Sequence, residues 1–141
     1  MKPRRLLALI ALLPALLLFT CDQQRSSAST TTVLEHHLQA VGEGNLDEIM
    51  ADYAADAILY TPNGPLRGTA AIREFFIALP GILPPGFWEN SKMVRQDVDG
   101  EVAYIVWASG SAVPLGTDTF VVRNGQIVVQ TFAAHMVPSS D

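Results

Sequence analysis

Apolar residues return every three or four positions in three segments of the chain, which is the period of an amphipathic helix. Leu34, Leu38 and Val41 form the first such stripe. We therefore expect a helix over residues 33–43, and the three threonines before it offer caps for its start. Gly44 is expected to end it.

The same period predicts two further helices. Asn45 and Glu48 resemble a capping box at the start of the second helix. Its expected buried stripe consists of Leu46, Ile49, Met50 and Tyr53. Thr69 is the expected cap of the third helix, which Pro80 and Gly81 should stop. Its expected core face consists of Ile72, Phe75, Phe76 and Leu79.

Strand patterns dominate the rest of the chain. A short strand is expected over residues 57–61, closed by a Pro-Asn-Gly-Pro turn. Two hairpins follow: residues 93–98 with 102–108 through Asp99-Gly100, and 119–122 with 127–132 through Asn124-Gly125. Helices first and strands last predict an α+β fold, with the helices on one face of a curved antiparallel sheet.

The first segment of the chain has the pattern of a secretory signal. Lys2, Arg4 and Arg5 precede an apolar run over residues 6–19. This run is shorter than the roughly 20 residues that a helix needs to cross a membrane. We expect residues 1–20 to be a signal peptide and the protein to be exported.

Cys21 is the only cysteine, so the domain cannot contain an intrachain disulfide. The run Leu18-Phe19-Thr20-Cys21 resembles a bacterial lipoprotein box, which makes Cys21 the expected site of lipid attachment. Phe19 and Thr20 are bulkier than the small residues usual there, so cleavage after Ala28 by an ordinary signal peptidase is the alternative. The expected location is the periplasm, either as a soluble protein or as a membrane-anchored lipoprotein.

Composition divides the remaining chain and limits its partners. Residues 21–32 are rich in Ser, Thr and Gln and should form a flexible tether, followed by one domain over 33–137 and a tail over 138–141. Without residues 1–20, six basic and fourteen acidic residues remain, a net charge of −8. Nucleic acid is not an expected partner, because phosphate binding requires clustered Lys and Arg. A membrane is expected to be contacted only through the lipid.

Three runs of residues resemble the SnoaL-like and nuclear-transport-factor-2-like superfamily. They are Gly44-Asn45-Leu46-Asp47, the run YAADA from Tyr53, and the run GPLRGTAAIREFF from Gly64. The order of the predicted elements agrees with this family over residues 33–137. The resemblance implies a cone in which three helices are wrapped by a bent sheet, an apolar pocket inside the cone, and a homodimer formed through the outer face of the sheet.

The resemblance also suggests positions for chemistry. Ketosteroid isomerases of this family use a carboxylate base at the end of the first strand, a tyrosine on the first helix and a protonated aspartic acid on the sheet. Thr61 occupies the position of the base and cannot take a proton from carbon at neutral pH. His37 matches the tyrosine, and Asp118 matches the sheet aspartate, with Phe120 following at the family's spacing. An enzyme is therefore not established.

His37 and Asp118 are the candidate catalytic residues, each with a structural alternative. Helical spacing independently turns His37 inward, where it is either a core histidine or a polar group at the pocket floor able to donate to a carbonyl or relay a proton. Asp118 is either bound by backbone amides at the start of its strand or a neutral carboxyl that donates a hydrogen bond. The two residues could also pair with each other. His36 should face away from the core, and the face of His135 is not determined by the pattern.

The expected ligand-binding residues line the cone, and ordinary core packing is the alternative, preferred for the aromatic side chains. They are Leu34, Tyr53, Leu59, Thr61, Phe75, Phe120 and Phe132. The apolar connection over residues 82–88 is expected either to plug the cone or to cover a ligand. No metal is expected, because no acidic residue has metal-site spacing to the three histidines. No phosphate-binding glycine loop or nucleophile elbow is present, and no cofactor is expected.

Three functional hypotheses remain. The first is binding of a small apolar or carbonyl-bearing molecule without turnover, which fits the missing base. The second is an isomerase, cyclase or lyase in which His37 replaces the carboxylate and Asp118 stabilises an enolate-like oxygen. The third is a dimeric interaction module whose cone is only a core.

Overall fold

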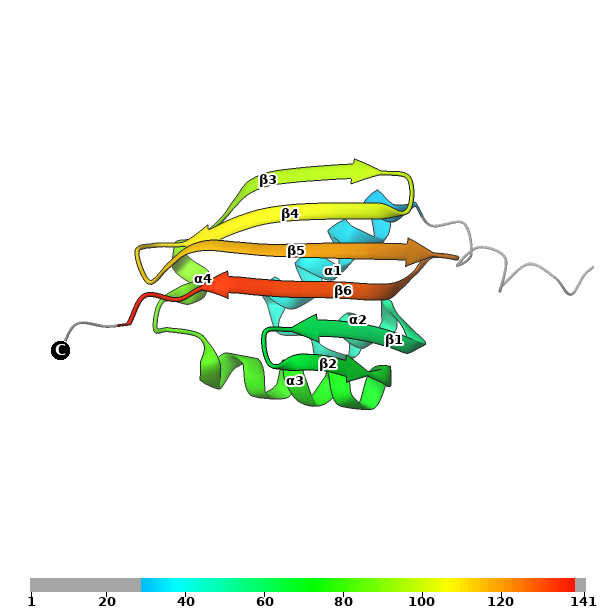
Figure 1. Cartoon of the computed structure of the whole chain (residues 1–141), viewed down its shortest axis with the longest axis horizontal. Helices are drawn as coiled ribbons and strands as arrows, with labels where there is room; N and C mark the ends of the chain where they lie inside the picture. Colours follow the sequence, from blue (N-terminus) through cyan, green and yellow to red (C-terminus); the bar gives the residue numbers. More distant parts are fainter. Residues whose placement is uncertain (1–28, 139–141) are drawn as a thin grey trace, which may run out of the picture.

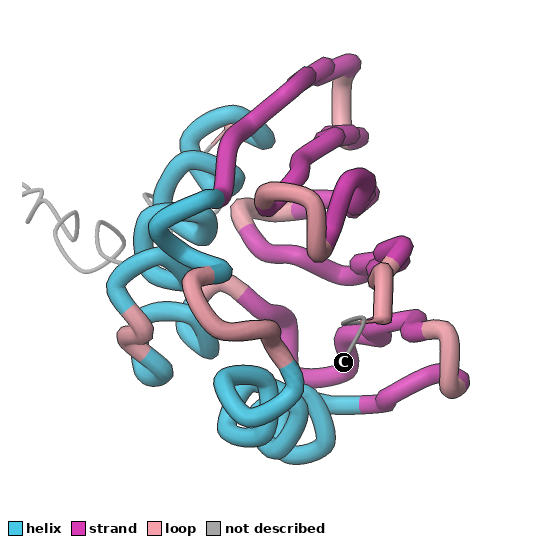
Figure 2. The backbone as a smooth tube through the Cα atoms, turned by 90° about the vertical axis from the view of Figure 1, so that its left-hand side faces the viewer, coloured by secondary structure: helices cyan, strands magenta, loops and turns pink. Residues whose placement is uncertain are grey.

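The protein is described by a computed structural model over residues 29–138, so the expected signal peptide, Cys21 and residues 139–141 lie outside the described residues. Within this range, helices lie on one side of a single curved sheet (Figures 1 and 2). The elements are α1 (Thr30–Glu43), α2 (Leu46–Ala51), β1 (Tyr53–Thr61), β2 (Gly64–Arg67), α3 (Gly68–Ile82), α4 (Phe87–Asn90), β3 (Ser91–Asp99), β4 (Val102–Ser109), β5 (Val113–Arg123) and β6 (Gln126–His135).

The six strands follow the order β2-β1-β6-β5-β4-β3. All neighbouring pairs are antiparallel except β1 and β6, which are parallel. This pair differs from the antiparallel sheet that we expected. A long part of the chain connects β1 to β6, so no hairpin turn forces the two strands to run in opposite directions. The last strand of the chain therefore lies near the centre of the sheet.

The first two helices begin and end at capping residues. Ser29 caps α1, and its Oγ accepts a hydrogen bond from the backbone N–H of Thr32 at 3.1 Å, so the helix starts earlier than predicted. Gly44 ends α1 in the left-handed conformation, with φ at 66°. The prediction that Tyr53 lies on α2 was wrong. Tyr53 pairs with Ile127 of β6, and this tertiary pairing overrides the helical period.

The third helix extends past its predicted stop. Pro80 lies inside α3, and the backbone N–H of Leu83 still bonds to the carbonyl of Leu79 at 3.1 Å. Proline lacks an N–H and its ring crowds the carbonyl four residues earlier, but in the last turn these losses do not end the helix. Thr69 lies within the first turn and is not the cap, which is Arg67 without a side-chain hydrogen bond.

The predicted hairpin at Asn124-Gly125 is confirmed. Both residues have positive φ, 51° and 73°, as a two-residue hairpin turn that follows the twist of the strands requires. The strand before it begins at Val113, well before the predicted start at residue 119. Asp118 therefore lies in the middle of β5 and not at its start.

The core lies between α1, α3 and the inner face of the sheet. The largest fully buried side chains are Leu34, His37, Leu59, Ile72, Val113, Phe120 and Ile127. His37 points inward, as the helical spacing predicted. Within residues 29–138, no helix combines the length and the apolar character needed to cross a membrane.

Candidate functional site

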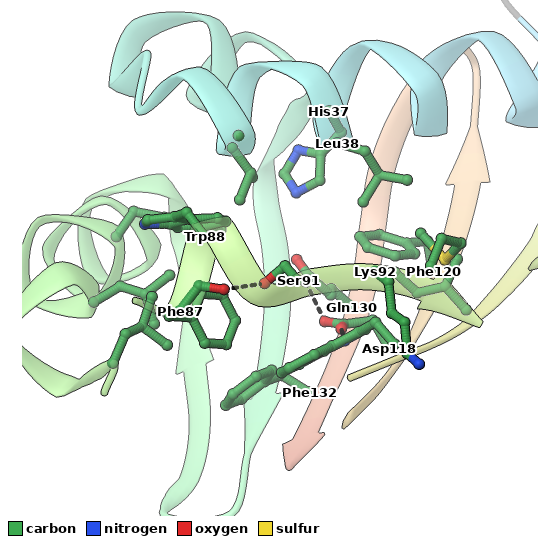
Figure 3. Close-up of a pocket in the computed structure, with 18 of the residues that line it drawn as sticks. His37, Leu38, Phe87, Trp88, Ser91, Lys92, Asp118, Phe120, Gln130 and Phe132 are labelled. Atoms are coloured by element: carbon green, nitrogen blue, oxygen red, sulfur yellow. Dashed lines mark hydrogen bonds between the residues drawn. The ribbon is translucent and has the colours of Figure 1, made fainter. Parts of the chain in front are cut away.

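A cavity of about 400 Å³ lies between the helices and the inner face of the sheet (Figure 3). Helix α1 forms its roof, the end of α3 and α4 form one side, and β4, β5 and β6 form its floor. Apolar side chains supply most of the wall: Leu38, Val41, Phe75, Phe76, Leu79, Leu83, Phe87, Ile105, Trp107, Phe120 and Phe132. Among them lie three buried polar side chains, those of His37, Asp118 and Gln130.

His37 projects from α1 into the site and is 1% exposed. Its ring meets Tyr53, Phe76 and Phe120 edge to face, with centroids 5.3, 6.0 and 5.5 Å away. Its Nδ1 is fully buried and has no hydrogen-bonding partner among the described residues, although Oδ2 of Asp52 lies 3.4 Å away. The ring is therefore held by aromatic packing and by a nearby carboxylate.

Asp118 lies on β5 with its carboxylate directed into the site (Figure 3). Oδ2 accepts a hydrogen bond from Nε1 of Trp107 at 2.8 Å, and Oδ1 accepts one from Nε2 of Gln130 at 2.8 Å. Both oxygens thus receive side-chain donors, and the expected bonds from backbone amides are not used. Two converging N–H donors are the arrangement that an ionised carboxylate requires.

The carboxylate also sets the direction of a longer chain of hydrogen bonds. Gln130 must turn its amide nitrogen towards Asp118, because an amide oxygen facing a carboxylate would be repelled. The Gln130 Oε1 then faces Tyr53, whose hydroxyl donates to it. The series of hydrogen bonds therefore runs from Tyr53 through Gln130 to Asp118, with every donor directed towards the carboxylate.

Burial shifts the ionisation of both ends of this chain. Desolvation raises the pKa of Asp118 above its ordinary value, against the opposing effects of the hydrogen bonds from Gln130 and Trp107 and of nearby His37. Burial, reinforced by the charges of Asp118 and Asp52, raises the pKa of the Tyr53 phenol well above 10. Tyr53 is therefore a neutral hydrogen-bond donor at all ordinary pH values.

The position of Trp107 depends on the residue opposite it in the sheet. Trp107 pairs with Gly116, and a Cβ at position 116 would overlap the six-membered part of the indole ring. Glycine thus permits the indole to lie against β5 with Nε1 next to Asp118. Phe132 stacks on the same indole at 6.3 Å with an interplanar angle of 13°, which completes the aromatic floor.

The segment over residues 82–88 lies at the opening of the cavity. Phe87 is buried and packs edge to face on Trp107 at 5.6 Å, whereas Trp88 is 45% exposed. The Phe87 carbonyl accepts hydrogen bonds from the hydroxyls of Ser91 and Ser109, both at 2.6 Å. The segment is therefore anchored to β3 and β4 and narrows the opening without filling the cavity.

The structure separates the predicted ligand-binding residues into groups. Phe75, Phe120 and Phe132 line the cavity together with His37 and Asp118. Leu34 and Leu59 lie in the core away from the cavity wall, and Tyr53 lies behind the wall, in contact with Gln130 and His37.

Thr61 lies elsewhere. It borders a second cavity of about 640 Å³ between the β1–β2 turn, α3 and the end of β6. Its hydroxyl donates to the Gly64 carbonyl at 3.0 Å and accepts from the Asn63 N–H at 3.2 Å, so it stabilises the turn. This second cavity shares Phe75, Leu79 and Phe132 with the first but contains none of its buried polar network.

The other histidines lie outside the cavity. His36 faces away from the core and donates from Nδ1 to Asp52, at 2.8 and 3.0 Å from the two carboxylate oxygens. His135 is exposed near the end of β6. No cluster of residues that could hold a metal ion occurs between residues 29 and 138.

Sequence reasoning missed Trp107 and Gln130 as polar members of the site. Each was expected as a residue of a predicted strand, Trp107 within residues 102–108 and Gln130 within residues 127–132. A buried tryptophan or glutamine needs a hydrogen-bonding partner, and this is the one signal that could have linked both residues to Asp118.

Comparison with known proteins shows which sequence family the chain matches and which solved structures share its fold. Residues 34–130 match the SnoaL-like domain. An NTF2-like protein of unknown function from Burkholderia xenovorans is 19% identical, with 84% of this chain and 90% of that chain covered and a TM-score of 0.60. A candidate polyketide cyclase from Sinorhizobium meliloti is 18% identical, with 72% and 93% covered and a TM-score of 0.60. A protein with a cystatin-like fold from Methylobium petroleophilum is 16% identical, with 79% and 78% covered and the same TM-score. At these identities the solved structures confirm the predicted α+β fold.

Proposed function

The chain belongs to the SnoaL-like domain family, and from this premise we propose that it binds a small, largely apolar molecule in the cavity beneath α1. The observation that carries the proposal is the meeting of an apolar cavity of about 400 Å³ with one buried, fully oriented carboxylate, that of Asp118. Ligand sites are commonly apolar hollows of roughly 300–1,000 Å³ with a few placed polar groups.

The polar network supports ligand binding more than simple core packing. A core of this size would be more stable if apolar residues replaced the aspartate, because burying a carboxylate is unfavourable unless it is well paired. Here Trp107, Gln130 and Tyr53 are all arranged around Asp118. Such an arrangement is useful to a protein that must orient a polar group on an otherwise apolar ligand.

Two helical glycines offer a matched test. Gly42 on α1 borders the cavity and Gly81 on α3 does not, and a Cβ at either position meets open space. We expect Gly42→Phe to block the opening and Gly81→Phe to leave it unchanged. Native mass spectrometry of each purified protein, followed by extraction and identification of the retained molecule, measures occupancy.

The expected result is a stoichiometric small molecule in the wild type and in Gly81→Phe, with its loss in Gly42→Phe. An empty wild-type protein that also fails to bind any member of a panel of small apolar molecules would overturn the proposal. Equal occupancy in both variants would place the ligand outside this cavity.

A second candidate function is proton transfer on a carbonyl compound, of the isomerase, cyclase or lyase type. The observation that favours it is that His37 and Asp118 face the same apolar cavity, where burial raises the pKa of Asp118 towards the range useful for a general base. Trp107 and Gln130 already donate to Asp118, so a base role for this carboxylate is better supported than the stabilisation of an enolate oxygen.

Catalysis would be tested with Asp118→Asn and His37→Gln. We expect both variants to lose turnover of a candidate carbonyl substrate at least a hundredfold while retaining affinity for it within a few fold. Unchanged turnover in both variants would contradict the catalytic function and would leave the proposed binding function intact.

A further inference from the structure

We propose that the cavity selects molecules whose buried polar group is a hydrogen-bond donor, such as an alcohol or phenol hydroxyl, and that Asp52 sets this preference by orienting the protons of His37. The inference rests on the proposed binding function and narrows its ligand class. It is drawn from the donors and acceptors that remain once every hydrogen bond within the site has been assigned.

Three side-chain donors of the cavity wall are directed at acceptors within the protein. Nε1 of Trp107 and Nε2 of Gln130 donate to Asp118, and the Ser91 hydroxyl donates to the carbonyl of Phe87. The Tyr53 hydroxyl behind the wall donates to Gln130. A ligand carbonyl beside Asp118 would instead set its oxygen against the carboxylate with no proton between them, which weakens binding.

The acceptors are not used up. Each oxygen of Asp118 accepts a single side-chain hydrogen bond, whereas a carboxylate offers about four acceptor positions. Asp118 is one of the residues that line the cavity. A ligand hydroxyl can therefore donate to Asp118 without disturbing Trp107 or Gln130.

His37 adds a second acceptor because of the carboxylate behind it. Nδ1 lies 3.4 Å from Oδ2 of Asp52 and is fully buried. A lone pair on Nδ1 would face a negatively charged oxygen with no proton between them, so the neutral ring carries its proton on Nδ1. Nε2 then holds the lone pair. Because Nε2 also makes no hydrogen bond among the described residues and yet is not enclosed as Nδ1 is, it is available to a molecule in the cavity.

Asp52 is suited to this positioning role because it is fixed in place. Its carboxylate accepts from Nδ1 of His36 at 2.8 and 3.0 Å, and its backbone carbonyl accepts from the Ile127 N–H at 2.7 Å. It therefore connects α1, the end of α2 and the start of β6. Lys92 is the one cationic side chain among the described residues that border the cavity. It lies on exposed β3 at the opening and can only contact the outer end of a ligand.

Three bicyclic probes that differ in one substituent test the preference. Naphthol carries a donor, naphthaldehyde carries a carbonyl acceptor, and methylnaphthalene carries neither. Isothermal titration calorimetry at neutral pH should give naphthol an affinity about tenfold higher than either of the others, which corresponds to one hydrogen bond made in a buried site.

Substitution of Asp52 tests the positioning role. Asp52→Asn should lower the preference for naphthol about threefold, because an amide can donate to Nδ1 as well as accept from it, while Asp118 remains as an acceptor. Asp47→Asn is the matched control, since Asp47 is exposed on α2, the helix that Asp52 follows, and pairs with Arg73 at 2.6 Å, outside the cavity wall. Nitrogen-15 NMR of the His37 ring should show the proton on Nδ1 in the wild type and in Asp47→Asn, and a mixture of tautomers in Asp52→Asn.

Each outcome separates the two proposals. If none of the probes binds and no other small apolar molecule does, the binding function itself fails. If all three bind with equal affinity, or naphthaldehyde binds most tightly, the cavity binds ligands but the donor preference is wrong. If naphthol is preferred equally in Asp52→Asn and the wild type, or the NMR spectra place the proton of His37 on Nε2, the role of Asp52 is wrong.

Discussion

Replacing His37 with phenylalanine should stabilise the protein while removing a polar group from the site. The ring is 1% exposed, and the three aromatic neighbours that meet it edge to face can meet a phenyl ring in the same way. The substitution removes the buried Nδ1, which lies 3.4 Å from Oδ2 of Asp52 but makes no hydrogen bond within residues 29–138. An unsatisfied buried polar atom costs about 1–3 kcal/mol.

Part of this gain is lost because Asp52 no longer has His37 beside it. Asp52 keeps its hydrogen bonds from His36, so the loss should be the smaller term. We expect His37→Phe to raise the free energy of unfolding by about 1 kcal/mol, which is a rise of several degrees in Tm for a domain of this size. His37→Ala, which leaves a cavity among the same aromatic rings, should instead lower stability by about 2–4 kcal/mol.

Urea unfolding followed by circular dichroism, together with calorimetry, measures both variants. If His37→Phe is as unstable as His37→Ala, the imidazole makes polar interactions that hold the core together, and the interpretation of His37 as a group kept for function is refuted. Stabilisation with a loss of naphthol affinity would show that the protein gives up stability to keep the imidazole in the cavity.

Three further predictions follow from other parts of the molecule. Tyr53→Phe should lower the free energy of unfolding by about 1 kcal/mol at neutral pH, because the Oε1 of Gln130 loses its hydrogen-bond donor. Because the pKa of the Tyr53 phenol is raised in the folded protein, the unfolded state loses this proton first as pH rises. The stability of the wild type should therefore fall above about pH 10, and that of Tyr53→Phe should not. Urea midpoints measured across this range test the difference. Gly116→Ala should displace the Trp107 indole and change its fluorescence, whereas an unchanged emission spectrum would mean that the indole does not lie against β5. Cys21→Ser should move the full chain from the membrane fraction to the soluble fraction of the producing cell, and equal distribution of both proteins would argue against a lipid anchor.

The local features of the fold could be predicted because each depends on residues close together in sequence. The helical stripe placed His37 inside the domain, and Asn124-Gly125 fixed a hairpin turn. The fold class followed from the order of these elements. Features that depend on distant pairing could not be predicted in this way, as the position of Tyr53 on β1 shows.

The polar network escaped prediction for a specific geometric reason. At the turn between β5 and β6, Arg123 pairs with Gln126. If the pairing continued from there without a break, Thr131 would lie opposite Asp118. A bulge between Val121 and Val122 shifts the register by one residue. Because a shift of one residue moves side chains to the other face of a strand, the bulge brings Gln130 to the same face as Asp118. No turn or hydrophobic pattern in the sequence marks this bulge.

The parallel pairing of β1 with β6 has a consequence for how the domain folds during synthesis. β6 is the last strand to leave the ribosome, and it occupies the place between β1 and β5. Until it arrives, β1 and β2 have no sheet to join, and pairing between segments so distant in sequence is slow. His37 and Tyr53 come from the first quarter of the domain and Gln130 from its end, so we expect the site to assemble in the final folding step. A chain cut short before residue 126 should therefore yield helices and a hairpin without any binding site.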